Sequence, residues 1–573
     1  MKISKSTSSS SSSLLLEPPT SKKSRISNDS TIQSTSSSSI IHSSVADVAS
    51  MQEFHLVESH ITDYKKEFQN ATPFPNLFVK NLLSKGFLEN VRDELLLPTT
   101  NWNQKKNDLY DFYQSDSLTS SSITSSLTST HCLVKLLYSR KFRDWIETIT
   151  RISTTDMIDV SAAKYIRGSH LLCHDDNLST RRIAYILYLT PENWTENDGG
   201  NLDLFCTESD SQSTPSHKIG KSITPVFNSI AFFEVSHKSF HQVAEVFSDI
   251  KGPRLSISGW FHGKTPLPPP QMPLIKGPTF YKCSKLFSTR RGSMKETYMP
   301  CTSVFNPLYT KQGVISQMKK SFTRDASLQL DGFLQPGTAK SFRSQFGSEK
   351  YDWVPIGPIN QQSFRIMNLP LSHDSISNIL SSQSITYPKT YSFQTFVFEQ
   401  LLSETFYEFI CNTTGLIFDQ VSIQIRCFTH GDYTMLTDPH YKASTKKKKA
   451  EAVVKRALEA VEKLNTLEIQ KDLYNEEEDR DFIDNKSSFV EVNLCLATPP
   501  DYTSTNETSE WPEEAGGYVS YMTEDDQLLC VPPKENSLSL VLKEPGVMSF
   551  VKFVTSDAPG PRYDINFLFR VKS

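Results

Sequence analysis

The sequence lacks the patterns that mark a secreted, zinc-ribbon or membrane-spanning protein. Its nine cysteines are scattered, odd in number and never spaced as Cys-x-x-Cys, which argues against both a disulfide framework and a zinc ribbon. No run of about 18 apolar residues occurs, and Leu14–Leu16 is much shorter than the apolar part of a signal peptide. We therefore expect a protein of the cytoplasm, the nucleus or both, without membrane association.

The sequence also lacks a strong excess of positive charge. Its 573 residues carry a formal net charge of -4, whereas a protein that binds nucleic acid through the phosphate backbone has a basic domain. Direct DNA binding is therefore not expected. The length exceeds what one hydrophobic core normally serves, so two or more domains are predicted.

Residues 1–50 and a stretch near the middle of the chain have distinctive compositions. Residues 1–50 are rich in serine and poor in apolar groups, which predicts disorder. A small basic cluster in this tail, Lys22, Lys23 and Arg25, is either an import signal or simply solvated charge. Residues 264–300 begin with several prolines, which cannot continue a sheet, and are predicted to be a linker.

The ordered part is predicted to be mainly β. Residues 74–96 combine a short extended entry with helical spacing of apolar residues. From Met157 onward, short runs rich in Ile, Val, Tyr and Phe alternate with turn signals, which is typical of a sandwich or jelly roll. We expect an α+β fold with a mainly β core and flanking helices.

Four stretches of the first half recur in the same order in the second half. Each match alone is weak, but their common order favours two copies of one β domain, at residues 60–263 and 301–573. The pairs are Gly168–Asp176 with Gly431–Pro439, the run ending at Pro191 with the run ending at Pro499, residues 198–205 with 515–522, and the strands that begin at Arg254 and Arg562.

The second copy contains an insertion, residues 444–485. Four lysines lead into an apolar stripe at helical spacing, and an acidic run follows. Two interpretations remain open, an exposed helical excursion packed on its own domain and a helix that binds a partner.

Three residues of the first copy form a candidate metal site. His174 and Asp176 stand two positions apart in a predicted strand, where side chains two apart share a face, and His241 follows among later strands. Two imidazoles and one carboxylate on one face of a metal leave positions open for a co-substrate and O2, as non-haem Fe(II) oxygenases require. The alternative is that His174 hydrogen-bonds in a core and Asp176 caps a turn.

Arg254 lies in an otherwise apolar strand and shares a face with Ser256 and Ser258. A buried arginine needs an anionic partner, and the far carboxylate of 2-oxoglutarate would provide one. The neighbouring histidines His170, His237 and His262 fall outside the pattern and are expected at the surface or in hydrogen bonds.

Taken together, these motifs resemble a known enzyme family. Residues 74–263 are similar to the catalytic domain of iron- and 2-oxoglutarate-dependent prolyl hydroxylases. The whole chain resembles the ribosomal prolyl 3-hydroxylase family of the termination and polyadenylation protein type, which has two tandem double-stranded β-helix domains. The motifs that carry the resemblance are GSHLLCHDD, RRIAYILYL, DGGNLDLF, SFHQVAEV and RLSISGWF.

The resemblance implies roles for individual residues. His174, Asp176 and His241 would hold Fe(II), and Arg254 would bind the C5 carboxylate of 2-oxoglutarate. Tyr165 and Tyr188 would line the co-substrate pocket, although aromatic core positions in a sheet are an equal alternative. The implied co-substrates are 2-oxoglutarate and O2, and ascorbate is a further expectation.

The implied reaction is hydroxylation of a prolyl residue, at the 3-position, in a small-subunit ribosomal protein. The family association with translation termination and accuracy suggests termination factors or messenger ribonucleoprotein as further partners. Two alternatives remain: the same oxygenase chemistry on another protein or a nucleic acid, and a noncatalytic adaptor in ribosome or mRNA complexes. The complete triad with Arg254 counts against the adaptor.

The second copy is predicted to be noncatalytic. Thr437 and Pro439 take the places of His174 and Asp176, and no histidine follows His440. His430 lies two residues before Asp432, but it aligns with Arg167 rather than with a ligand. Arg562, at the position of Arg254, is then either a structural remnant or a contact for a partner.

Overall fold

The computed structural model describes most of the chain in one compact unit, Val48–Ser573. The described residues are 52–119, 128–209, 213–268, 277–287, 304–346, 351–367, 393, 397–436, 487–497, 511–524 and 526–572. The predicted disordered tail and the predicted insertion at 444–485 lie outside these ranges. Among the described helices, none has the length and apolar composition that a membrane crossing requires.

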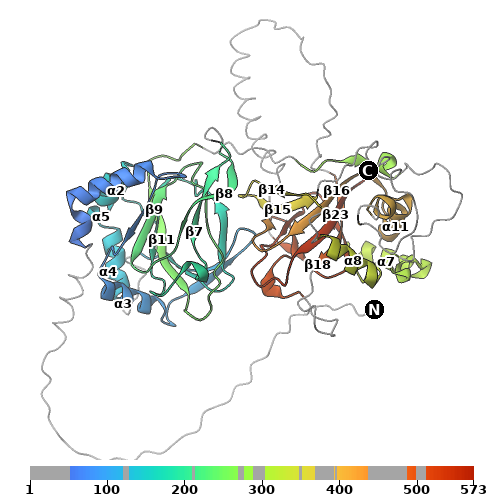
Figure 1. The fold of residues 1–573 in the computed structure, drawn as a ribbon, viewed down its shortest axis with the longest axis horizontal. Helices are drawn as coiled ribbons and strands as arrows, with labels where there is room; N and C mark the ends of the chain where they lie inside the picture. Colours follow the sequence, from blue (N-terminus) through green and yellow to red (C-terminus); the bar gives the residue numbers. More distant parts are fainter. Residues whose placement is uncertain are drawn as a thin grey trace, which may run out of the picture. The chain divides into compact units, whose positions relative to one another are not determined.

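Helices cover one face of the first sheet (Figure 1). Ser84 and Ser139 cap α3 and α5 by accepting hydrogen bonds from the main-chain N–H groups of Phe87 and Phe142. Apolar side chains of these helices pack with those of β6, β9 and β11 in one core. The elements are η1 (Glu53–Leu56), α2 (Glu58–Asn70), α3 (Lys85–Leu95), α4 (Thr128–Leu137), α5 (Arg140–Thr150) and η2 (Glu196–Asp198).

The first sheet is antiparallel, in the order β1-β9-β6-β11-β4-β3-β5-β10-β7-β8, with β2 paired to β3. Most neighbours in this order are not consecutive in sequence, as in a jelly roll. The strands are β1 (Asn76–Lys80), β2 (Trp102–Lys106), β3 (Tyr110–Ser115), β4 (Ser161–Tyr165), β5 (His170–His174), β6 (Arg181–Tyr188), β7 (Leu202–Thr207), β8 (Pro215–Ile223), β9 (Ser229–Glu234), β10 (His241–Val243) and β11 (Arg254–His262).

The second copy repeats this design with its own core. Its helical elements are α6 (Cys283–Leu286), η3 (Pro307–Thr310), α7 (Gln312–Asp325), α8 (Pro336–Phe346), η4 (Val397–Leu401), α11 (Glu404–Thr414) and η5 (Glu513–Ala515). Its strands are β12 (Tyr281–Lys282), β13 (Ser327–Asp331), β14 (Trp353–Ile356), β15 (Gln362–Met367), β16 (Phe418–Phe428), β17 (Tyr433–Thr434), β18 (Phe489–Ala497), β19 (Val519–Met522), β20 (Gln527–Val531), β21 (Ser537–Lys543), β22 (Met548–Val551) and β23 (Arg562–Val571).

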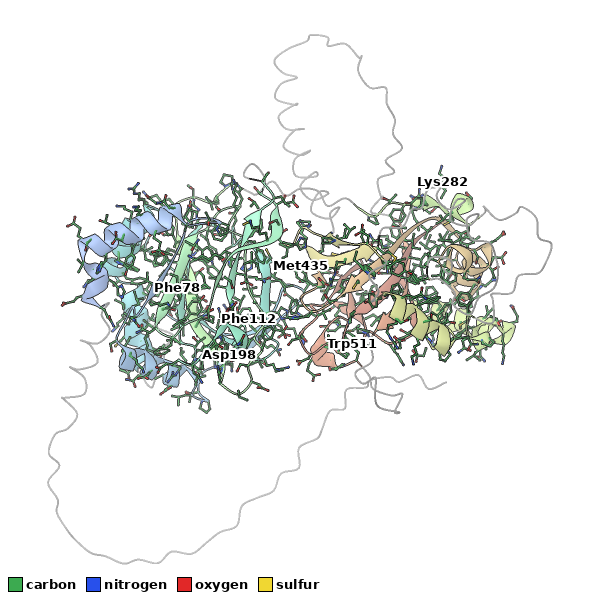
Figure 2. The ribbon with its side chains drawn as sticks, viewed as in Figure 1. Phe78, Phe112, Asp198, Lys282, Met435 and Trp511 are labelled. Atoms are coloured by element: carbon green, nitrogen blue, oxygen red, sulfur yellow. The ribbon has the colours of Figure 1, made fainter. Side chains whose placement is uncertain are left out.

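The order of the strands confirms the predicted pair of jelly rolls. The second copy has the order β13-β21-β18-β23-β16-β15-β14, with β17 on β15, and a separate three-stranded sheet β22-β19-β20. These strands follow the order of the first sheet, except that β17 and β22 are not paired as β5 and β10 are. Smaller details agree as well. The indole N–H of Trp194 donates to the carbonyl of Gly199, and that of Trp511, labelled in Figure 2, donates to the carbonyl of Gly516.

One alignment between the copies was wrong by one residue. The sequence comparison placed Pro191 on Pro499 and hence Tyr188 on Leu496. In the sheets, Tyr188 pairs with Ser229 and Ser256, whereas Cys495 pairs with Ser537 and Asp564. Cys495 is therefore the true counterpart of Tyr188. Because strand side chains alternate between faces, a shift of one residue exchanges the interior and exterior positions.

Two predicted boundaries differ from the structure. Ordered chain begins before residue 60, because η1 and α2 precede the predicted extended entry. The predicted linker, 264–300, contains β12, whose Tyr281 pairs with Val421 of β16. This part of the linker therefore belongs to the second sheet.

Candidate active site

The two histidines of the candidate triad come together because β5 and β10 are neighbours. His241 pairs directly with His174, and their ring centroids are 4.2 Å apart. The Nδ1 atom of His174 lies 2.8 Å from the carbonyl of Leu172, and that of His241 lies 2.8 Å from the carbonyl of Ser239. These carbonyls fix each ring with Nε2 available as a ligand.

Asp176 reaches the same place from outside the strand. β5 ends at His174, and Asp176 has a left-handed φ of 59°, so the expectation that strand alternation aligns the pair was wrong. Its Oδ1 lies 3.5 Å from Nε2 of His174 and its Oδ2 lies 3.3 Å from Nε2 of His241. Among the described residues these three side chains form the one cluster suited to a metal ion, with ligand atoms within 4.8 Å of one another.

The electrostatics of this cluster favour a cation. Burial would raise the pKa of Asp176, but His174 and His241 beside it hold that pKa well below its ordinary value. Burial would likewise lower the pKa of His174, but the Asp176 carboxylate raises it overall. The carboxylate is therefore negative at neutral pH, and two imidazoles with one carboxylate suit Fe(II).

Two further side chains orient Asp176, and the sequence analysis missed both. The indole N–H of Trp260 donates to its Oδ2 at 2.9 Å, and the Arg181 guanidinium lies 3.4 Å from its Oδ1. Arg181 also stacks on the Trp260 ring at 3.5 Å. Trp260 lies at an even spacing from Arg254 on β11, so strand alternation would have identified it.

Arg254 is almost completely buried, with 1 % of its surface exposed, and carries unused hydrogen-bonding capacity. Its Nε donates to the carbonyl of Gly200 at 2.6 Å. Neither its Nη2 nor the neighbouring Tyr188 hydroxyl has a hydrogen-bond partner among the described residues. A buried cation with free donors fits an anionic ligand such as a carboxylate.

The two predicted tyrosines flank the arginine. The guanidinium carbon of Arg254 lies 4.9 Å from the ring centre of Tyr165 and 5.2 Å from that of Tyr188. Phe112, labelled in Figure 2, stacks on Tyr165 with centroids 4.8 Å apart. Burial raises the pKa of Tyr188 to about 12, so its hydroxyl stays a neutral donor. Their part in co-substrate binding stays a prediction.

The other histidines stand apart from this group. His170 is buried with Nδ1 against the carbonyl of Gly168, and His262 contacts Thr180 and Asp159. His237 is exposed.

The second copy fills the corresponding place with its own side chains. Arg562 pairs with Phe428 as Arg254 pairs with Tyr165, but both oxygens of Asp564 accept hydrogen bonds from it, at 2.9 and 2.6 Å. Asp564 stands where the first copy has Ser256. Ser549 occupies the position of His241, since it pairs with Tyr521 as His241 pairs with Leu204. Thr437 and Pro439 lie outside the described residues.

Longer polar side chains also replace small or apolar ones around Arg562. Arg426 stands where the first copy has Ala163, and Asn493 where it has Ile186. Arg426 lies 3.2 Å from Asp564 and hydrogen-bonds Asn493. Arg562 is thus part of an internal ion-pair network, and the suggestion that it contacts a partner was wrong.

The fold and this site define a class of enzyme, the non-haem Fe(II) oxygenases. Residues 160–262 match the family model of the 2OG-Fe(II) oxygenase superfamily, and residues 301–573 match the model described as "Oxoglutarate and iron-dependent oxygenase degradation C-term". The match over residues 160–262 agrees with the His174, Asp176 and His241 site, and a 2OG-Fe(II) oxygenase uses Fe(II), 2-oxoglutarate and O2.

Similar proteins cover nearly the whole chain. "Prolyl 3-hydroxylase OGFOD1" of Xenopus laevis is 29% identical over 491 residues, covering 85% of this chain and 84% of that protein. The Mus musculus protein of the same name is 28% identical over 511 residues, covering 84% of each. "Prolyl 3,4-dihydroxylase OGFOD1" of Ostreococcus tauri is 27% identical over 547 residues, covering 87% of this chain and 95% of that protein.

Proposed function

We propose that the chain hydroxylates a prolyl residue of a protein, with Fe(II), 2-oxoglutarate and O2. The observation that carries the chemistry is the cluster of His174, Asp176 and His241. Beside it, the buried Nη2 of Arg254 has no hydrogen-bond partner among the described residues. The choice of proline rests on the relatives, whose names describe prolyl 3-hydroxylases and a prolyl 3,4-dihydroxylase. The 3-carbon is therefore the proposed position.

The geometry supports the following residue roles. Nε2 of His174, Nε2 of His241 and a carboxylate oxygen of Asp176 hold the metal, with Trp260 and Arg181 orienting that carboxylate. Arg254 holds the far carboxylate of 2-oxoglutarate, and the Tyr188 hydroxyl assists it. Bound Fe(II) with 2-oxoglutarate and O2 supplies the oxidising chemistry, and the protein positions the target carbon.

We propose a small-subunit ribosomal protein as the substrate and translation termination as the process affected. Support comes from the resemblance to the ribosomal prolyl 3-hydroxylase family. The net charge of -4 is compatible with a basic protein partner. The proposed place of action is the cytoplasm, the nucleus or both, where ribosomal proteins are made and assembled.

We propose that the second copy is noncatalytic. Asp564 already supplies a carboxylate to Arg562, and Ser549 replaces the distal histidine. Because Arg562 already donates to both oxygens of Asp564, it is not available to bind the carboxylate of a co-substrate.

The test is to incubate the full chain with Fe(II), 2-oxoglutarate, O2 and individual small-subunit ribosomal proteins, and to locate any added oxygen by mass spectrometry. The wild type should add one oxygen to a proline of one substrate. His174→Ala should abolish the modification, and His237→Ala, which changes an exposed histidine outside the site, should retain it.

Two results would count against this proposal. A wild-type protein that modifies none of the ribosomal proteins would contradict the ribosomal substrate. An oxygen placed on a residue other than proline would preserve the oxygenase chemistry and refute prolyl hydroxylation.

A further inference from the structure

The second copy packs against the strands that carry the histidine ligands. Cys173 precedes His174, Phe240 precedes His241, and both are 1 % exposed. They belong to one apolar cluster whose other members include Tyr433 and Phe553 of the second copy. Met435, labelled in Figure 2, packs against the same cluster. The wall of the active-site barrel is therefore shared with the second copy.

A buried carboxylate joins the two copies beside this cluster. Glu245 follows β10 and is 3 % exposed. Nε2 of His430 lies 2.7 Å from its Oε2. The main-chain N–H of Ser556 donates to both carboxylate oxygens at 3.1 and 3.0 Å, and the Ser556 hydroxyl donates at 2.9 Å. These partners all belong to the second copy, so the cost of burying this charge is offset from outside the catalytic domain.

The main chain of Glu245 is linked to the co-substrate arginine. The carbonyl of Glu245 accepts a hydrogen bond from the N–H of Gly200 at 2.9 Å, and the carbonyl of Gly200 accepts one from Nε of Arg254 at 2.6 Å. Glu245 is thus two hydrogen bonds away from the guanidinium.

The glycine turn between Glu245 and Arg254 has no spare space. A Cβ on Gly199 would lie 2.1 Å from the Glu245 carbonyl oxygen, and a Cβ on Gly200 would lie 2.6 Å from Cδ of Arg254. These close contacts leave Glu245, the glycine turn and Arg254 little room to move independently, because closely packed groups transmit strain.

We propose that Glu245 is a positioning residue through which the second copy holds Arg254 ready for 2-oxoglutarate. The inference rests on the proposed function, in which Arg254 binds the co-substrate carboxylate. It gives the noncatalytic copy a defined role, because His430 and Ser556 fix Glu245. Glu245 in turn fixes the turn at Gly200, and that turn fixes the arginine.

The test measures 2-oxoglutarate affinity without turnover, by calorimetric titration into the full chain loaded with Mn(II) in the absence of O2. Glu245→Ala should weaken binding about tenfold, within the usual range of coupling between sites. Because that variant leaves Arg254 in place, kcat at saturating 2-oxoglutarate and the affinity for Mn(II) should stay near the wild-type values.

A variant confined to the second copy tests the same chain of contacts from its far end. His430→Ala combined with Ser556→Ala removes the imidazole and the hydroxyl but keeps the main-chain N–H of residue 556, so it should weaken 2-oxoglutarate binding in the same direction and by less than Glu245→Ala. Adding Glu245→Ala should bring the affinity to that of Glu245→Ala alone, since residues acting in one chain are not additive. Asp557→Asn is the matched control. It removes the ion pair with Arg167 between the copies, which lies outside this chain of contacts, and should leave the affinity unchanged.

The outcomes separate the two proposals. A wild-type protein that binds no 2-oxoglutarate overturns the proposed function, and the positioning role with it. Wild-type binding together with an affinity of the Glu245→Ala variant within about twofold of the wild-type value overturns the positioning role alone. A lowered melting temperature without a change in affinity also overturns it, because Glu245 would then be structural only.

Discussion

At the scale of single residues, Arg254 and Arg562 show how one neighbour decides what a buried cation can bind. Arg562 donates to both oxygens of Asp564, so its charge is neutralised within the strand. The counterpart of Asp564 in the first copy is Ser256, which carries no charge, and Arg254 keeps free donors. The residue at this position thus decides what the buried arginine can bind. With aspartate its charge is already neutralised, and with serine it can accept a carboxylate from a bound ligand.

Arg254→Lys should weaken 2-oxoglutarate binding by roughly 10- to 100-fold. Lysine keeps the charge, but it cannot donate the forked pair of hydrogen bonds that a carboxylate accepts from a guanidinium, a loss of about 1.5–3 kcal/mol. Titration of the Mn(II)-loaded protein measures the change. An affinity equal to that of the wild type would show that the carboxylate binds elsewhere.

Arg562→Met should lower the stability of the protein and leave its 2-oxoglutarate affinity unchanged. It leaves Asp564, which is 0 % exposed, with only Arg426 as a cationic partner, so the free energy of unfolding should fall by about 3 kcal/mol. Denaturant unfolding measures this loss, while 2-oxoglutarate affinity of the folded protein should not change. A variant that lost affinity with unchanged stability would contradict the assignment of the open site to the first copy.

At the scale of elements, the glycine turns before β7 and β19 have the same backbone but different surroundings. Gly200 and Gly517 both have positive φ, 71° and 67°, where a Cβ costs roughly 1–2 kcal/mol. A Cβ at Gly200 would meet Arg254 at 2.6 Å, whereas at Gly517 the nearest atom is 3.4 Å away. An alanine at either position should therefore cost similar backbone strain, but only the alanine at 200 would clash with an arginine.

Gly200→Ala should lower both stability and 2-oxoglutarate affinity, and Gly517→Ala should lower stability alone. The alanine at 200 must displace the arginine side chain, whereas the alanine at 517 meets ordinary contact distances. Melting temperatures and calorimetric titration of both variants distinguish the effects. Equal affinities in the two variants would show that the turn does not constrain Arg254.

Lys552, just after β22, makes the contact between the copies sensitive to pH. It is buried, its Nζ donates to the carbonyls of Asn107 and Tyr110 in the β2–β3 turn, and burial lowers its pKa from 10.5 to about 8. The unfolded chain binds the proton more tightly, so stability rises as the pH increases from about 8 toward 10.5. Below that window a penalty of about 3 kcal/mol is fully present.

Lys552→Met removes this titration. Denaturant unfolding at a series of pH values from about 7.5 to about 10 should show the wild type gaining stability relative to the variant as the pH rises. A difference between the two proteins that does not change with pH would contradict the assignment of the shift to Lys552.

The strands and glycine turns were predictable from sequence because they depend on local patterns. Alternation on β11 and the paired glycines of DGGNLDLF and AGGYVSYM identified corresponding elements correctly. The local pattern failed where geometry departs from a regular strand: Asp176 turns away from β5, and the alignment of β6 with β18 was shifted by one residue. The role of Glu245 had no local signal, since Ser556 lies 311 positions away in the sequence.

At the scale of the whole molecule, the chain has two copies of one fold, one with a candidate metal site and one with ion-paired side chains in the corresponding place. The sequence indicated this division through the missing ligands. The structure adds a physical reason, because Arg426, Asn493 and Asp564 occupy the space around Arg562, and Asp564 pairs with both arginines. A buried network of ion pairs is costly to open, so the second barrel resists conversion into a binding site.

One metal ion and one 2-oxoglutarate should therefore bind each chain. Calorimetric titration with Mn(II) under anaerobic conditions, followed by 2-oxoglutarate, should give a stoichiometry of one for each. In the second copy Ser549 replaces the distal histidine, and the Asp564 carboxylate already occupies the arginine that corresponds to Arg254. His174→Ala removes one of the three ligands and should abolish tight metal binding, whereas His430→Ala, in the second copy, should retain a full equivalent. Two equivalents of either ligand in the wild type would mean that the second barrel opens in solution.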